Sequence, residues 1–190
     1  MLKKSLSAIA LIAFSLPSFA ANTLIEMKTS SGNIEIELFN DKAPITVKNF
    51  EEYVKSNFYT GTIFHRVIPG FMIQGGGFDL NMQEKANNKA SIKNESDNGL
   101  QNKRGTLAMV RTNDPNSAKA QFFINLVDNS FLDRSPRNAG YAVFGRVTKG
   151  IEVVDKIAQV PTQNYGMHQD VPKTAVKINS VTIKAPSVKK

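Results

Sequence analysis

The sequence predicts a mainly β fold, a closed eight-stranded antiparallel β-barrel capped by two α-helices. Eight short segments have the length and residue pattern of strands, whereas only two segments repeat apolar residues at helical spacing. No internal repeat or low-complexity linker divides the chain. A closed barrel is favoured because closure removes the exposed strand edges that promote aggregation.

The first two strands are predicted to form a hairpin. Residues 24–28 and 34–38 alternate apolar and polar side chains, which is typical of strands with one buried face. Residues 30–33, Ser-Ser-Gly-Asn, have the composition of a turn. The chain should therefore reverse between the two segments and pair them.

The two helices are predicted further along the chain. The first runs from about Pro44 to Val54, because proline suits the first turn and apolar residues then recur every three or four positions. The second covers residues 151–158, after Gly150, where apolar residues again form a single stripe. Both stripes predict helices that pack against the barrel.

Six further strands are predicted from short apolar runs. They cover residues 61–67, 71–75, 106–111, 121–126, 142–147 and 176–184. The three glycines at 75–77 lack the Lys-Ser/Thr of a phosphate loop, and we interpret them as a bulge or tight turn that ends a strand. Residues 163–170 are expected to form a loop.

The N-terminus has the features of a cleaved signal peptide. Lys3 and Lys4 precede an apolar run at 8–16, and Ser18-Phe19-Ala20 has the small residues of a cleavage site. We predict a signal peptide over 1–20 and a single domain over 21–190, exported to the periplasm. The apolar run is shorter than the ~20 residues of a membrane-spanning helix, so no membrane association is expected after cleavage. The alternative is a buried N-terminal helix.

Composition argues against several classes of function. The formal net charge is +8, and cleavage would lower it by two, but the basic residues are dispersed, which indicates solvated surface rather than nucleic-acid binding. The chain has no cysteine, so disulfides and thiolate sites are impossible. Its two histidines are not at a metal-ligand spacing, and no GxSxG hydrolase motif is present. We expect neither a metal nor a cofactor.

Four motifs carry a family resemblance. They are FHRVIPGFMIQGGGF at 64–78, LAMVR at 107–111, QFFI at 121–124 and VFGRV at 143–147. In these motifs, and in their order from about Leu24 to Lys184, the chain resembles the cyclophilin family of peptidyl-prolyl cis-trans isomerases. The resemblance implies an eight-stranded barrel with two capping helices, in agreement with the strand and helix count.

The resemblance also implies roles for individual residues. Arg66 matches the catalytic arginine, Gln74 the glutamine that holds its guanidinium, and Phe71 a catalytic-site aromatic. Because Pro69 and Gly70 interrupt the strand, Arg66 and Gln74 should meet across a hairpin. Substrate-binding positions are matched by His65, Met72, Arg111, Phe123, Phe131, Leu132 and Tyr141, with Phe123 as the floor of the proline slot.

Each of these residues also has a purely structural interpretation. Phe64, Phe122, Ile124, Val143 and Phe144 are predicted to be plain core, and several slot residues would pass for core if seen alone. A buried Arg66 could instead pair with a carboxylate such as Glu84 or Asp79. The rival to an isomerase is a non-catalytic module or periplasmic holdase that grips proline-containing segments.

Two positions depart from the family pattern. Phe131 occupies a place where many relatives carry a tryptophan that contacts cyclosporin, and the chain has no tryptophan. We therefore expect weak cyclosporin binding. Tyr141 stands where many relatives have a histidine, which changes the polarity of the groove. The expected partners are proline-containing polypeptide clients, bound by a monomer.

Overall fold

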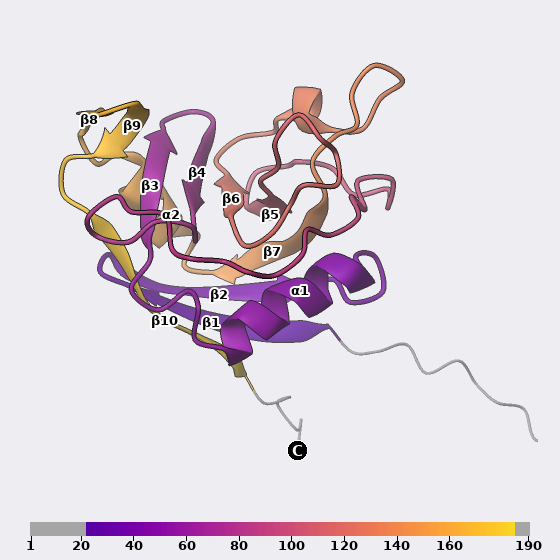
Figure 1. Ribbon diagram of the computed structural model, residues 1–190, viewed down its shortest axis with the longest axis horizontal. Helices are drawn as coiled ribbons and strands as arrows, with labels where there is room; N and C mark the ends of the chain where they lie inside the picture. Colours follow the sequence, from indigo (N-terminus) through magenta and orange to yellow (C-terminus); the bar gives the residue numbers. More distant parts are fainter. Residues whose placement is uncertain (1–21, 185–190) are drawn as a thin grey trace, which may run out of the picture.

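The computed structural model describes residues 22–184, so the signal peptide predicted over 1–20 lies outside the described residues. Eight strands close into a barrel in the order β1-β10-β3-β4-β6-β5-β7-β2, and every neighbouring pair is antiparallel (Figure 1). They are β1 (Thr23–Thr29), β2 (Gly32–Leu38), β3 (Ile63–Ile68), β4 (Met72–Gly75), β5 (Thr106–Met109), β6 (Phe122–Asn125), β7 (Val143–Lys149) and β10 (Val176–Lys184). The predicted barrel is confirmed.

The two helices, α1 (Pro44–Lys55) and α2 (Ile151–Ala158), pack their apolar stripes into the barrel core. Pro44 stands at the first turn of α1, where its missing N–H has no helical acceptor to lose. Phe50 from α1 and Ile157 from α2 are fully buried among the inward side chains of the strands. No helix between residues 22 and 184 is both long and apolar enough to cross a membrane.

Strand alternation separates two apolar clusters. Phe122 and Ile124 of β6 face the barrel interior, whereas Phe123 between them belongs to a second cluster on the outer face. Alternate side chains of the neighbouring strands also face the interior and the outer cluster in turn. The second cluster is built from Met72, Ala108, Phe123, Leu132 and Val143. The five residues predicted to be plain core are all buried, with Val143 in this outer cluster. The outer cluster forms the floor of the site described below.

A tight turn joins β3 to β4. Gly70 has a φ of +72°, and the Phe71 N–H donates to the Ile68 carbonyl at 3.1 Å. Proline followed by a left-handed glycine is the signature of a type II turn. The turn aligns Arg66 opposite Gln74, so the prediction that they meet across a hairpin is confirmed at the backbone level.

The glycine run ends β4 as predicted. Gly76 has a φ of +81°, and a Cβ there would lie 2.8 Å from the Phe122 ring. A Cβ at Gly77 would collide with the side chain of Gln121. Glycine is needed here because the chain turns sharply while passing close to β6.

The expectation of a loop over residues 163–170 is wrong. The segment forms a two-stranded antiparallel sheet of β8 (Thr162–Tyr165) and β9 (His168–Pro172), separate from the barrel. Its side chains are largely polar and exposed, so it lacks the apolar alternation by which strands are recognised in a sequence. Gly166, with a φ of +57°, lies in its turn. The hairpin lies beside β3 and packs against it (Figure 1).

Candidate active site

A small slot opens on the outer face of the barrel, over the second apolar cluster. It has a volume of about 240 Å³, which is below the roughly 300–1,000 Å³ of sites for drug-sized ligands. Its lining is Arg66, Phe71, Met72, Gln74, Val110, Arg111, Phe123, Leu132 and Tyr141. Eight of the ten residues selected from the sequence therefore meet in one cavity. Its size and apolar floor suit a single small ring.

The two remaining candidates lie next to the slot. Phe131 is 65% exposed and stacks on Phe71, with ring centroids 5.6 Å apart and an angle of 27° between the planes. His65 is buried and lines an adjoining pocket instead. Phe131 therefore extends the aromatic wall outward to the surface, and His65 lines a neighbouring pocket together with Arg66 and Gln74.

Arg66 stands at the edge of the slot with its side chain 41% exposed. Its Nε lies 3.6 Å from Oδ2 of Asp170, on β9. The alternative of a buried arginine paired with a carboxylate is therefore wrong on burial, and the partner carboxylate is Asp170 rather than Glu84 or Asp79. Asp170 could not be identified from the sequence, because it is distant from Arg66 in the chain and its strand carries no apolar alternation.

Gln74 has a different partner from the one inferred. Its Nε2 donates to Oε1 of Gln121 at 3.1 Å, and no hydrogen bond joins the described side chains of Gln74 and Arg66. The proposed role of Gln74 in holding the guanidinium therefore rests on their adjacency across β3 and β4, not on a hydrogen bond. Gln121 is an additional residue of the site that the sequence did not single out.

Buried amides support the aromatic wall from below. Asn129 donates from Nδ2 to the Phe71 carbonyl at 3.0 Å and to Oδ1 of Asn125 at 2.8 Å. Asn125 in turn donates to Oδ1 of Asn102 at 3.2 Å. All three asparagines are almost fully buried, and satisfied buried amides of this kind hold a structure in one arrangement. The network fixes Phe71 and the short 3₁₀ turn Ser130–Leu132.

Arg111 and Tyr141 form the opposite wall. The guanidinium of Arg111 lies 4.5 Å from the centroid of the Tyr141 ring, and its Nε donates to the Gly140 carbonyl at 2.9 Å. The side chain is thus held against the protein. Within residues 22–184, the backbone N–H and carbonyl of Arg111 have no hydrogen-bond partner.

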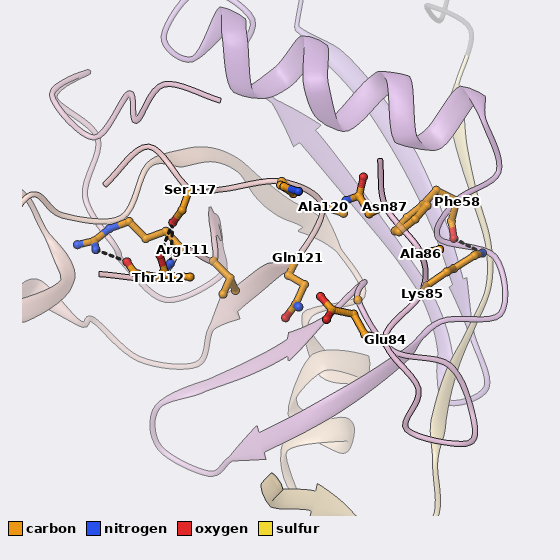
Figure 2. Close-up of a pocket in the computed structure, with 13 residues that line it drawn as sticks. Phe58, Glu84, Lys85, Ala86, Asn87, Arg111, Thr112, Ser117, Ala120 and Gln121 are labelled. Carbon is orange, nitrogen blue, oxygen red and sulfur yellow. Dashed lines mark hydrogen bonds between the residues drawn. The ribbon is translucent and has the colours of Figure 1, made fainter. Parts of the chain in front are cut away.

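Two further pockets flank the slot. The larger, of about 480 Å³, shares Val110 and Arg111 with it. Figure 2 shows this pocket extending from Arg111 and Thr112 past Gln121 toward Lys85. The other, of about 340 Å³, shares Arg66 and Gln74 with the slot and lies against the β8–β9 hairpin. The slot is therefore part of a larger groove, in which the two flanking pockets also share Gln121 with each other.

His65 is held as a neutral imidazole. Burial lowers the pKa of His65 from 6.5 to about 4, and the nearby His168 and Arg66 lower the pKa in the same direction. Its ring lies 4.5 Å from that of Phe78, and Nδ1 has no hydrogen-bond partner in the described structure. At neutral pH His65 therefore adds no charge beside Arg66. Elsewhere in residues 22–184, no group of three or more His, Cys, Asp or Glu side chains could hold a metal ion.

Replacing His65 with glutamine is expected to reduce acid destabilisation. The imidazole takes up a proton near pH 6.5 when unfolded but only near pH 4 when folded. The contribution of His65 to the free energy of unfolding is therefore fully present above pH 6.5. It is lost as the pH falls toward 4, and the total loss is about 3 kcal/mol. Urea unfolding of both proteins at intervals from about pH 7.5 to about pH 4 should show the larger loss in the wild type. Equal losses would contradict a neutral buried imidazole, since the carboxylates are common to both proteins.

Comparisons with known proteins agree with this architecture. A family model described as cyclophilin type peptidyl-prolyl cis-trans isomerase/CLD matches residues 24–183. A peptidyl-prolyl cis-trans isomerase of Acinetobacter baylyi is 70% identical over 165 residues, covering 87% of each protein. Peptidyl-prolyl cis-trans isomerase A of Dickeya dadantii is 56% identical over 189 residues, covering 96% of this chain and 98% of that protein.

Solved structures show the same fold. A Cryptosporidium parvum cyclophilin type peptidyl-prolyl cis-trans isomerase, determined in the presence of the dipeptide Ala-Pro, matches with a TM-score of 0.70 and 27% identity. The match covers 85% of this chain and 99% of that chain. Barrel, sequence motifs and relatives together define an enzyme that interconverts cis and trans peptidyl-prolyl bonds. Within that class, the chain belongs to the cyclophilin type peptidyl-prolyl cis-trans isomerase family.

Proposed function

We propose that the protein accelerates rotation about X–Pro bonds in exported polypeptides, with Arg66 as the catalytic donor. The bond is held planar by a barrier of about 18–20 kcal/mol, and its uncatalysed exchange takes tens to hundreds of seconds. No covalent bond has to break, so neither a nucleophile nor a cofactor is required. The enzyme has only to bind the twisted bond more tightly than either planar form.

A hydrogen bond to the prolyl nitrogen provides that selectivity. In the planar bond the nitrogen lone pair is conjugated with the carbonyl and cannot accept a hydrogen bond. When the bond twists, the lone pair localises on the nitrogen and can accept a hydrogen bond. A donor fixed at that point therefore stabilises the transition state and not the ground states.

The observation that carries this proposal is the position of Arg66 at the edge of the slot that Phe123 floors. A proline ring seated on Phe123 places the prolyl nitrogen at the rim, within reach of the guanidinium. Arginine suits this role because its planar group keeps its charge and presents donors in fixed directions. Lysine would present a flexible point charge.

The groove also offers a path for the flanking polypeptide. The two outer pockets both adjoin the slot, one at Arg111 and the other at Arg66. The unpaired backbone groups of Arg111 support an extended segment between them. The Ala-Pro dipeptide named with the Cryptosporidium parvum structure is consistent with a site for short prolyl segments. Proline-containing clients are therefore the proposed partners.

Export to the periplasm is proposed from the N-terminal sequence alone. It predicts a mature protein that begins at Ala21 and assists the folding of exported proteins. Fractionation of the parent cells, with mass determination of the mature N-terminus, tests this proposal. A full-length protein retained in the cytoplasm would contradict it.

Weak cyclosporin binding is proposed from Phe131. Its ring is 65% exposed at the rim and stacks on Phe71, so no indole N–H is available there for a ligand. A calorimetric titration with cyclosporin should give an affinity weaker than the nanomolar class. Nanomolar binding would show that the absence of tryptophan is not limiting.

The test of the proposed mechanism is replacement of Arg66 with alanine. Binding and isomerisation of one prolyl peptide are measured on the same folded variant. Retained binding with lost isomerisation supports a catalytic donor. Unchanged isomerisation would contradict the mechanism and leave the groove as a binding surface.

A further inference from the structure

The guanidinium of Arg66 needs a second attachment if it is to act as a fixed donor. Arginine has a long side chain with several rotatable bonds, and ordering it is entropically unfavourable. Gln74 donates to Gln121 and not to Arg66. Among residues 22–184, Asp170 supplies the one carboxylate within ion-pair distance of Arg66, through Oδ2 at 3.6 Å from Nε.

The β8–β9 hairpin is shaped so that Asp170 can reach Arg66. Gln163 pairs with Val171, and Tyr165 pairs with His168. Between these two pairs β9 spans three residue steps and β8 only two. The extra residue makes a β-bulge, a feature that redirects side chains and is common near active sites. Asp170 lies in this bulge with a φ of +59°, in the left-handed region that few side chains tolerate.

The hairpin is also held in register with β3. The Phe78 ring lies between two histidines, with its centroid 4.5 Å from that of His65 on β3 and 5.0 Å from that of His168 on β9. β9 packs directly against β3. Asp170 therefore approaches Arg66 from a supported element rather than from a free loop.

We propose that Asp170 is a positioning residue for Arg66. By holding Nε from the hairpin side, it directs the terminal nitrogens of the guanidinium toward the slot, where the prolyl nitrogen becomes an acceptor. This inference rests on the proposed role of Arg66. It assigns the β8–β9 hairpin to the catalytic apparatus, although the hairpin lies outside the barrel and Asp170 does not line the slot.

Asp170→Asn is the appropriate test variant. Asparagine has nearly the same shape and is among the few residues that adopt left-handed backbone readily, so the bulge is preserved while the charge is lost. An ion pair of this exposure predicts a decrease of roughly two- to fivefold in kcat/KM for a neutral prolyl tetrapeptide. The decrease should fall on kcat, since the binding surfaces are untouched. Added salt should lower wild-type activity toward that of the variant by screening the pair.

Two comparisons isolate the effect. Asp155→Asn removes the carboxylate that pairs with Arg104. The Asp155 side chain is 42% exposed, against 38% for Asp170, and neither Asp155 nor Arg104 lines a pocket of the groove. Asp155→Asn should leave activity and salt dependence unchanged. In an Arg66→Ala background, Asp170→Asn should have no further effect, because Asp170 acts through the arginine.

Three results would overturn the inference. In the first, Asp170→Asn keeps the kcat and the salt dependence of the wild type. In the second, Asp170→Asn lowers kcat equally whether residue 66 is arginine or alanine. In the third, circular dichroism shows that Asp170→Asn is unfolded. Each would make Asp170 neutral or purely structural. If Arg66→Ala is itself as active as wild type, the proposed catalytic donor fails, and this outcome is separate from the other three.

Discussion

Arg66→Ala is expected to lower kcat/KM for a prolyl tetrapeptide by a factor of about 10²–10³, as does removal of a single transition-state donor in other enzymes. The loss should fall on kcat. The slot floor, the aromatic wall and the Arg111 backbone do not depend on the arginine, so peptide affinity should change little. Isomerisation kinetics and a peptide-binding titration on the same preparation measure the two quantities separately.

Two matched variants guard this prediction. Arg104→Ala removes a guanidinium that pairs with Asp155. The Arg104 side chain is 45% exposed, against 41% for Arg66, and neither member of the pair lines a pocket of the groove. Arg104→Ala should retain full activity. Arg66→Lys keeps the charge but loses the planar fork, and it should recover only a small part of the lost rate. Full activity in the lysine variant would indicate that charge alone is sufficient.

Alanine substitutions at the adjacent residues Phe122 and Phe123 are expected to differ in their main effect, which is on stability for Phe122 and on substrate binding for Phe123. Phe122 is fully buried in the barrel core, where its removal leaves a cavity, and Phe122→Ala should lower the free energy of unfolding by about 3–5 kcal/mol. Phe123 is the slot floor, and Phe123→Ala enlarges an open pocket, with a smaller stability loss of about 1–3 kcal/mol. It should raise KM strongly because the proline ring loses its contact surface.

Urea unfolding and steady-state kinetics on the two variants test this contrast. If Phe122→Ala does not fold, Phe122→Leu gives a smaller loss of stability and should keep a wild-type KM. Phe123→Leu is its matched partner and should raise KM while remaining well folded. Equal effects of the two leucine variants on KM would contradict the assignment of the two rings to opposite faces of β6.

The barrel could be predicted because its strands carry their own signal. The β1–β2 hairpin alternates apolar and polar residues, and the register confirms it by pairing Ile25 with Ile36 and Met27 with Ile34. β8 and β9 carry no such pattern, since their stability comes from the Gly166 turn and from packing on β3. Strands that are stabilised by tertiary contact and exposed to solvent are not visible in apolar periodicity.

The slot could be predicted where its residues lie within the motifs of the family. Arg66, Phe71 and Phe123 were assigned from such motifs, and the structure places all three in one cavity. Their catalytic and binding roles remain proposals. The contacts that hold the site are of another kind, because they join residues distant in the chain. Gln121 beside Gln74 and Asp170 beside Arg66 follow from strand pairing and hairpin packing, and no local pattern indicates them.

Two-dimensional exchange NMR on an Ala-Ala-Pro-Phe-type peptide tests the central claim most directly, because one sample reports both binding and on-enzyme isomerisation. With wild-type protein, exchange between the cis and trans forms of the peptide should be far faster than in the free peptide. With Arg66→Ala, the resonances should still shift on binding while exchange falls close to the uncatalysed rate. Fast exchange in the bound Arg66→Ala complex would contradict the assignment of Arg66 as donor to the twisted bond.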